Sequence, residues 1–266
     1  MDRLFDVIFV RPPSDSYDRC VSTNPASSTI DITLAKRQHK DYVSVLRENR
    51  SIQVIELPPL QDLPDSVFLT DAAILGATSC IIGRFGESSR RDENEVLANE
   101  LLDFTQVGCV ARIKAPGTLE GGDVLITDTE TFVGHQFEVE TPRTNLEGVR
   151  QFASLTKAKV NRVRSKTFHL LCACSFLRGK ELLLASEILS THCFPGFTFV
   201  HVPRDEIYAA EALYLGNGRV MVPAGYPKTT KNLKNAGYSP IEVELSEFYK
   251  GDGGVSCLSA PVYRML

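Results

Sequence analysis

Short apolar runs alternate with longer amphipathic stretches along the whole chain, and polar or glycine-containing segments separate them. Short apolar runs bounded by turn residues predict strands. We expect strands at Asp6–Val10, Ile52–Leu57, Val67–Leu69, Ala72–Leu75, Val124–Ile126, Phe132–Val133, Lys159–Val163, Leu182–Leu184, Phe197–His201, Ala212–Leu215, Val220–Val222 and Ile241–Val243. Stretches with helical spacing predict helices at Leu34–Glu48, Asp92–Phe104, Leu146–Leu155 and Thr230–Asn235.

The order of these elements predicts a mixed α/β fold. Polar turns at Thr127–Glu130 and Gly216–Gly218 join neighbouring strands and favour hairpins. Because helices recur between the hairpins, we expect a repeated strand–strand–helix unit instead of a doubly wound sheet or a sandwich. No linker or low-complexity segment interrupts the sequence, so residues 1–266 are interpreted as one domain.

One segment lacks this periodicity. The stretch Pro12–Ser28 is rich in Pro, Ser and Asp. Long loops without regular structure often carry function. The segment is therefore a candidate mobile lid.

Composition narrows the class of protein. The chain has 43% hydrophobic and 23% charged residues, as ordinary globular proteins do. A net charge of −4 argues against a general nucleic-acid-binding protein. No apolar run approaches the roughly 20 residues that cross a bilayer, and the acidic start Met1–Asp6 does not resemble a secretory signal. We expect a cytoplasmic protein with no membrane partner.

The chain contains seven cysteines. An odd number without an export signal favours reduced thiols over a disulfide framework. Most of them are expected to be small buried hydrophobic residues, and one is a candidate nucleophile.

Three segments carry candidate chemistry. In the first, Gly121-Gly122 lies between Glu120 and Asp123 and runs into an apolar strand. Adjacent glycines of this kind indicate a tight backbone passage that holds carboxylates at the end of a strand. An ordinary turn before a strand has the same pattern.

The second segment is Phe168–Cys174 and the third is Gly251–Ser259. His169 opens an apolar run, where a lone histidine is more often structural than catalytic. The glycines before Cys257 leave backbone room for a substrate beside its thiol, although a structural cysteine fits this pattern as well. A cysteine and a histidine together suit nucleophilic catalysis, because the thiolate attacks and the imidazole moves protons.

Together, these segments resemble the guanidino-modifying enzyme superfamily and, within it, the dimethylarginine dimethylaminohydrolase family. The similarity runs nearly end to end, and the motifs occur in the order of the family. They are Arg37-Gln38-His39 with Tyr42-Val43, Asp65–Asp71, Ser89-Arg90-Arg91, Glu120–Val124, Arg143-Thr144-Asn145, His169-Leu170 and Cys257. The resemblance implies a five-bladed α/β-propeller (pentein) of pseudosymmetric ββαβ-type repeats around a central site.

The resemblance also implies catalytic roles. Cys257 attacks the guanidinium carbon and forms a covalent thiouronium intermediate. His169 protonates the departing amine and then activates water. Glu120 and Asp71 bind the planar guanidinium through charge-assisted hydrogen bonds.

The remaining implied roles concern the rest of the substrate. Arg90 and Arg143 are expected to bind the α-carboxylate, and Asp65 the α-ammonium. Thr70 stands where the family usually has Glu or Gln, so its contact with the substituted nitrogen differs. The stretch from Gly134 to Arg143 is also longer than the usual short turn.

One position separates related activities. Arginine deiminases generally carry His-x-Asp, and this chain has Leu171 at the position of that Asp. An apolar residue suits methyl groups better than an N–H donor, because an unpaired donor would be costly. We therefore expect methylated arginine as the substrate, and citrulline with a methylated amine as products.

Three alternatives remain. The first is a deiminase that acts on free arginine or another guanidino compound. The second is a noncatalytic pentein binding protein, which would not need the catalytic set retained here. The third is metal binding through Cys172, Cys174 and Cys257, although this spacing lacks the second ligand pair of a zinc site.

No metal or other cofactor is expected, because a cationic substrate itself favours ionisation of the thiol. The expected partner is a small-molecule arginine derivative, with no nucleic acid. Assembly as a homodimer is left open.

Overall fold

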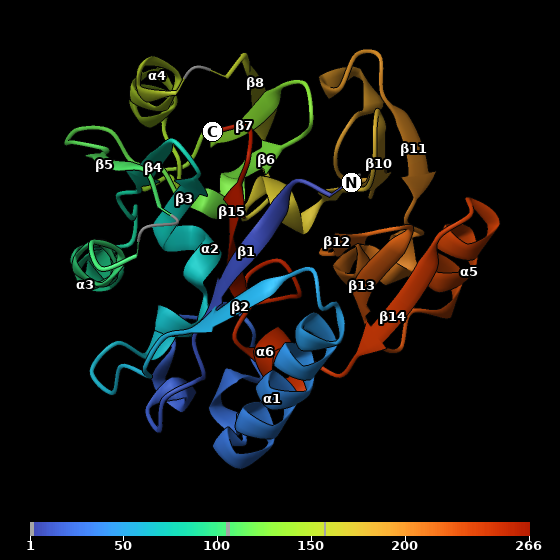
Figure 1. Ribbon diagram of the computed structural model, residues 1–266, viewed down its shortest axis with the longest axis horizontal. Helices are drawn as coiled ribbons and strands as arrows, with labels where there is room; N and C mark the ends of the chain where they lie inside the picture. The colour runs from blue at the N-terminus through green and yellow to red at the C-terminus, as the bar shows by residue number, and fades with distance from the viewer. Residues whose placement is uncertain (1–2, 105–106, 157) are drawn as a thin grey trace.

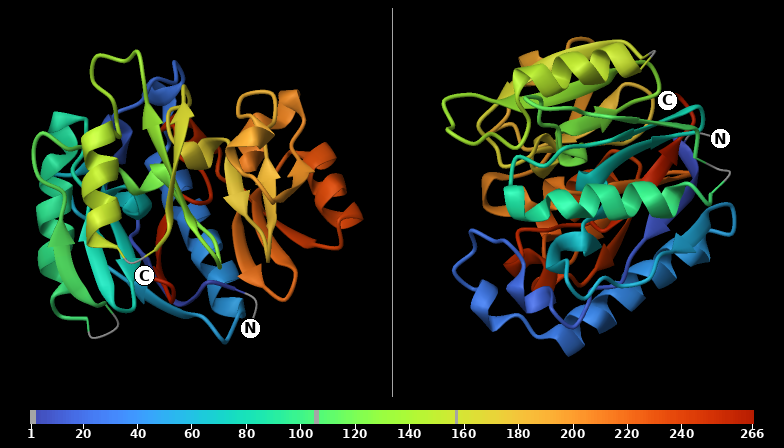
Figure 2. Two further views of the ribbon diagram at one scale, coloured as in Figure 1. Left: turned by 90° about the horizontal axis from the view of Figure 1, so that it is seen from above. Right: turned by 90° about the vertical axis from the view of Figure 1, so that its left-hand side faces the viewer.

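The computed structural model describes residues 3–104, 107–156 and 158–266. In this part of the chain, strands form three-stranded units around a centre, and the long helices lie at the periphery (Figure 1). Figure 2 shows the same arrangement from two further sides, with α5 (Pro227–Asn235) at the edge of the molecule.

Each unit has the same pairing, with two antiparallel strands followed by a third that is parallel to the second. Antiparallel neighbours need only a tight turn, whereas a parallel pair needs a crossover. Helix α1 (Ile32–Glu48), α3 (Arg91–Leu101), α4 (Leu146–Leu155) and α5 supply four of these crossovers. The fourth unit crosses through the short 3₁₀ turn Thr191–Cys193.

The strands of the units in the described ranges are as follows. They are β15 (Ser259–Tyr263), β1 (Phe5–Val10) and β2 (Gln53–Glu56); β3 (Ala73–Gly76), β4 (Ser79–Ile82) and β5 (Cys109–Arg112); β6 (Val124–Ile126), β7 (Thr131–Gln136) and β8 (Val160–Ser165); β9 (Cys174–Phe176), β10 (Glu181–Leu184) and β11 (Thr198–His201); and β12 (Leu213–Gly216), β13 (Arg219–Pro223) and β14 (Ser239–Val243). Two short helices, α2 (Leu69–Ala72) and α6 (Ser246–Lys250), lie outside this repeat. The expected pentein fold is confirmed.

The last strand completes the first unit. Strand β15 pairs antiparallel with β1 and parallel with β3, so the C-terminal segment lies between the first two units. Because Cys257 precedes β15 by two residues, this closure carries it to the same region as the end of α2.

Helix α1 anchors the segment that carries Cys257. Its buried residues recur at helical spacing and face the core. Tyr42 on this face is fully buried, and its hydroxyl donates to the Val255 carbonyl at 3.1 Å and lies 2.8 Å from the Ser259 hydroxyl. Burying an aromatic side chain contributes about 1.5–3 kcal/mol, so this contact both stabilises the core and holds the chain on either side of Cys257.

The predicted helices and most predicted strands are confirmed within a few residues. The strand expected at Val67–Leu69 is wrong, because Pro64 begins a 3₁₀ turn that ends at Val67, and α2 begins at Leu69. Strands β4, β5, β9 and β15 were not predicted, since each is short or has polar ends that hide its alternation. Within the described ranges, each helix falls short of the length and apolar character needed to cross a bilayer.

Candidate active site

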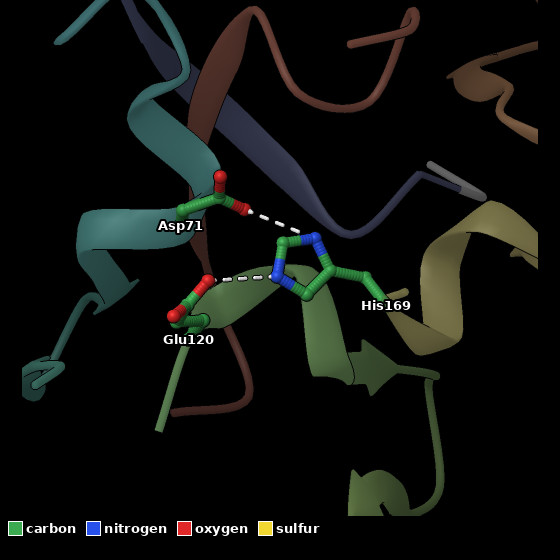
Figure 3. A group of neighbouring side chains, drawn as sticks. All are labelled: Asp71, Glu120 and His169. Atoms are coloured by element: carbon green, nitrogen blue, oxygen red, sulfur yellow. Dashed lines mark hydrogen bonds and ion pairs between the residues drawn. The ribbon is translucent and has the colours of Figure 1, made fainter. Parts of the chain in front are cut away.

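Three buried titratable side chains meet at one place, and each comes from a different unit or turn. Asp71 lies in α2, Glu120 precedes the 3₁₀ turn Gly121–Asp123, and His169 precedes the turn Leu170–Cys172. His169 Nε2 lies 2.8 Å from Glu120 Oε2, and its Nδ1 lies 3.7 Å from Asp71 Oδ1 (Figure 3). All three residues are at most 3% exposed. The sequence-predicted guanidinium ligands and the predicted acid–base group therefore lie together.

A glycine permits this approach. A Cβ at Gly122 would lie 2.6 Å from His169 Nδ1 and 2.8 Å from Asp71 Oδ1. Any larger residue would push these side chains apart, so the double glycine is explained by the packing of the site.

The two carboxylates control the protonation of His169. Burial by itself lowers the pKa of His169, but attraction to Asp71 and the hydrogen bond to Glu120 outweigh this effect and raise the pKa to about 9. The imidazole is therefore a cation at neutral pH and is able to donate a proton.

Cys257 lies at the end of the glycine-rich turn that follows α6, and it is 8% exposed. Its thiol donates a hydrogen bond to Glu211 Oε2 at 3.3 Å. Burial, followed by the nearby carboxylates of Glu211 and Asp71, raises the pKa of Cys257 well above its ordinary value. The thiol is thus protonated before a substrate arrives, and no hydrogen bond joins it to His169 within the described ranges.

Glu211 is a site residue that the sequence reasoning missed. It is 3% exposed, and burial raises its pKa to about 7 against the hydrogen bonds from the thiols of Cys257 and Cys172. A Cβ at Gly254 would lie 2.2 Å from Glu211 Oε2, so this glycine provides the room for the contact. The available signal was a charged residue between Ala210 and Ala212, at the start of an apolar strand.

A cavity of about 590 Å³ leads to this region. Glu211 and Cys172 line it, and the aromatic side chains Phe168, Tyr208 and Tyr249 form another part of its wall. Because Glu211 is hydrogen-bonded to Cys257, a molecule in the cavity comes within one side chain of the thiol.

Part of the candidate lid Pro12–Ser28 borders this cavity. Thr23, Asn24 and Pro25 line it, and the backbone N–H of Val21 donates to both oxygens of Asp65 at 3.1 Å. Asp65 is thus placed between the lid and the site, and its role toward an α-ammonium remains a prediction.

Arg90 has a different environment from the one expected for a substrate ligand. Its guanidinium is buried and donates to Asp71 Oδ2 at 3.0 Å and to both oxygens of Glu93 at 3.0 Å. These hydrogen bonds occupy N–H donors of the Arg90 guanidinium within the protein. Arg90 therefore orients Asp71, and its expected contact with the α-carboxylate stays a prediction.

Arg143 reaches the site despite the longer segment before it. Its guanidinium lies over the Phe168 ring at 4.5 Å, and its Nη1 lies 3.7 Å from Glu120 Oε2. The same Nη1 is buried and makes no hydrogen bond. A donor in this state is available for the carboxylate of a substrate.

Thr70 also differs from expectation. Its hydroxyl lies 2.5 Å from the Ser256 carbonyl oxygen and also contacts the Ser259 carbonyl oxygen. The side chain therefore holds the segment that carries Cys257, and its expected contact with the substituted nitrogen of a substrate stays a prediction.

Thr70→Val should destabilise the protein by about 1–3 kcal/mol, because it leaves buried carbonyl oxygens without a donor. We also expect slower turnover, since Cys257 would be held less firmly, with little change in KM. Thr70→Ser keeps the hydroxyl and should retain both properties. Thermal unfolding and steady-state kinetics check this, and equal activity in all three proteins would contradict it.

The expected role of Leu171 is not supported by its position. Its side chain lines a separate apolar cavity of about 60 Å³, with Phe176 and Tyr214. Residues that follow one another in a 3₁₀ turn point about 120° apart, so it is the next residue, Cys172, that faces the larger cavity. The apolar character of Leu171 thus says nothing about methyl groups on a substrate.

The cluster in Figure 3 also has the composition of a metal site, because ligand atoms of Asp71, Glu120 and His169 lie within 4.8 Å of one another. The same carboxylates would bind a guanidinium, which fills the same space with hydrogen-bond donors. We expect that dialysis against EDTA leaves turnover unchanged. Loss of turnover that one added divalent metal restores would contradict this expectation.

Comparison with known proteins identifies the family. A family model described as eukaryotic N,N dimethylarginine dimethylhydrolase matches residues 11–170. The dimethylarginine dimethylaminohydrolase of Pseudomonas aeruginosa is 35% identical over 96% of this chain and 99% of its own length. That of Streptomyces coelicolor is 32% identical over 94% of each chain.

Comparison with solved structures supports the same family assignment. A cysteine-to-serine variant of the Pseudomonas aeruginosa enzyme, complexed with citrulline, has a TM-score of 0.87 and 33% identity. It covers 97% of this chain and 100% of its own. The N-terminal domain of the cyanobacterial arginine dihydrolase ArgZ has a TM-score of 0.86 at 21% identity, which shows the shared fold alone. With this agreement in sequence and fold over nearly the full length, the chain belongs to the dimethylarginine dimethylaminohydrolase family.

Proposed function

We propose that this protein hydrolyses the guanidinium C–N bond of an Nω-methylated arginine and releases citrulline and a methylated amine. The observation that carries the proposal is the buried set of Asp71, Glu120 and His169, which lies close to Cys257 without being hydrogen-bonded to it. A planar cation held by the two acids presents its central carbon to the thiol.

The relatives support this choice of substrate. The two bacterial relatives bear the name dimethylarginine dimethylaminohydrolase, and one solved relative holds citrulline. A histidine-to-glycine variant of that family forms an adduct with S-methyl-L-thiocitrulline. A small-molecule arginine derivative therefore fits the site.

Binding begins with the charges. Asp71 and Glu120 accept hydrogen bonds from the guanidinium and hold it against Cys257, which converts a bimolecular encounter into an oriented one. Arg143 takes the α-carboxylate through its free donor, and Asp65 takes the α-ammonium beneath the lid. The ligand then spans the cavity from its cationic to its anionic end.

The reaction proceeds in two halves. The thiolate of Cys257 bonds to the guanidinium carbon, His169 gives its proton to the methylated nitrogen, and the C–N bond breaks to leave a thiouronium on sulfur. Neutral His169 then takes a proton from water as that water attacks the same carbon. The C–S bond breaks, the hydroxyl proton of the adduct passes to solvent, and neutral citrulline and the thiolate are released.

A second candidate is hydrolysis of free arginine. Its support is Glu211, a third buried acid beside Cys257 that could accept from an unmethylated nitrogen. Because Glu211 supplies a third carboxylate, the apolar residue at position 171 is no longer evidence against an unmethylated substrate.

Citrulline formation from arginine, monomethylarginine and asymmetric dimethylarginine, measured in parallel on purified protein, separates these candidates. We expect higher kcat/KM with the methylated substrates. Citrulline mainly from arginine would favour the second candidate, and none from any substrate would overturn both.

Two finer expectations belong to this proposal. All seven cysteines are free, which suits a reducing cytoplasm. A homodimer is tested by light scattering of the purified protein, where the mass of a single chain would contradict it.

A further inference from the structure

In the proposed reaction, the proton of the Cys257 thiol still lacks an acceptor. Cys257 is protonated before the substrate arrives, yet its thiolate must attack. His169 is poorly placed to take this proton, because its ring nitrogens face Glu120 and Asp71 and it is already a cation at neutral pH.

Glu211 is in the right place. Among the described residues, it is the one titratable side chain whose hydrogen bond to Cys257 Sγ is direct, at 3.3 Å with the thiol as donor. It is 3% exposed and reaches this position because Gly254 has no side chain. The site therefore contains a buried carboxylate aimed at the sulfur.

We propose that Glu211 is a catalytic residue and is the general base that takes the proton from the Cys257 thiol. This inference rests on the proposed function, because it assigns a step of that reaction. The step balances within the site: the S–H bond breaks, an O–H bond forms on Glu211, and the thiolate attacks the guanidinium carbon. When the C–S bond later breaks, the carboxylic acid returns its proton to the sulfur.

The binding of the substrate drives the transfer. A bound cation beside Cys257 stabilises the thiolate. Once Glu211 is protonated, its side chain is neutral and no longer repels the thiolate. Two residues then transfer different protons. Glu211 takes the proton of the nucleophile, and His169 serves the leaving amine and the attacking water. Because His169 is already a cation at neutral pH, it holds the proton for the leaving amine without first taking one from the thiol.

Several groups face Glu211 and set its titration. The thiols of Cys257 and Cys172 donate to it, His169 and Asp71 contribute opposite charges, and the hydroxyls of Tyr208 and Tyr226 lie close enough to interact. Burial outweighs the hydrogen bonds from the two thiols and the attraction to His169, and raises the pKa of Glu211 to about 7. As the pH falls below this value the carboxylate is lost, so kcat/KM should fall on the acid side.

The test uses Glu211→Gln, which keeps the shape and hydrogen-bonding capacity but accepts no proton. Two readouts are needed: kcat with monomethylarginine, and alkylation of Cys257 by 2-chloroacetamidine, an amidinium that brings a cation to the thiol without turnover. Mass spectrometry of the Cys257 peptide separates it from the other thiols. We expect both rates to fall by about 10²-fold or more, as for loss of a general base.

The control is Glu206→Gln. Glu206 is also a buried acid, but its carboxylate accepts from Lys228 and Thr229, away from the thiol. This variant should lose folding stability and keep the alkylation rate of Cys257 in the folded protein. Glu211→Asp should recover part of the lost rate.

The direction of the change in the alkylation rate of Cys257 distinguishes the possible roles of Glu211. If Glu211 were only a neighbouring charge, its removal would lower the pKa of Cys257 and make alkylation faster, so a faster rate would overturn the proposal. A rise in KM with unchanged kcat and alkylation would make Glu211 a substrate ligand and would also overturn it. If wild-type protein forms no citrulline but its alkylation still depends on Glu211, the proposed function fails and the assignment of Glu211 stands.

Discussion

Cys257→Ser should lose turnover by about 10⁴-fold or more, which is the scale on which an enzyme loses its nucleophile. At 1.36 kcal/mol for each factor of ten, this is about 5.4 kcal/mol of transition-state stabilisation. A serine hydroxyl fits the same space, but it is far harder to ionise than a thiol. No carboxylate at 3.3 Å restores that difference.

The fold of this variant should remain intact, because one small buried atom changes and the backbone bond from Cys257 N to the Gly254 carbonyl is unaffected. Cys109→Ser is the matched control, since Cys109 is exposed on β5 and lies in another unit. Citrulline formation and thermal unfolding are measured on both. Near wild-type turnover in Cys257→Ser would remove Cys257 from the mechanism.

His169→Ala should lower kcat by about 10²–10⁴-fold, the usual contribution of a general acid–base group. The loss is expected in both halves of the reaction, because His169 protonates the amine and later activates water. The same change leaves Glu120 buried without its 2.8 Å partner, so the protein should also be less stable.

His169→Gln separates these two effects. Glutamine can donate to Glu120 but cannot titrate, so it should recover folding stability and not turnover. Recovery of turnover would show that the ring is needed only for structure.

The wild-type pH profile gives the sign of the charge on His169. Its pKa is raised from 6.5 to about 9, so the charged form contributes folding stability below pH 6.5, and this contribution is lost as the pH rises through 9. We expect kcat to fall over the same alkaline range, because the leaving amine loses its proton donor. Activity that persists unchanged to pH 10 would contradict this assignment.

Much of the architecture was readable from the chain. The polar turns of Thr127–Glu130 and Gly216–Gly218 form hairpins as predicted, and Leu146–Leu155 is a helix over the predicted range. Asn145 is the N-cap of this helix, and its side chain accepts from Gly148 N at 2.8 Å. These features depend on neighbours in sequence, which is why pattern alone predicts them.

The residue types of the active site were also readable, but their partners were not. Arg90 and Thr70 were assigned to the substrate, yet one binds Asp71 and Glu93 and the other holds the carbonyl of Ser256. The contact of Thr70 joins segments that are brought together only when β15 closes the first unit, whereas Arg90 reaches Asp71 within the second unit. A sequence motif identifies the residue at a position but does not predict which groups its side chain contacts in the fold.

By itself, the sequence determined the repeating strand–strand–helix order and the family, and it predicted the nucleophile with its acids and histidine. Only the tertiary structure decided that Glu211 lies against Cys257, that Leu171 faces away from the cavity, and that Gly122 lets His169 approach Asp71. The physical reason is the range of the interactions. Local spacing sets the elements, whereas the pKa of Cys257 and the direction of its proton depend on carboxylates that are far away in the chain and adjacent in the fold.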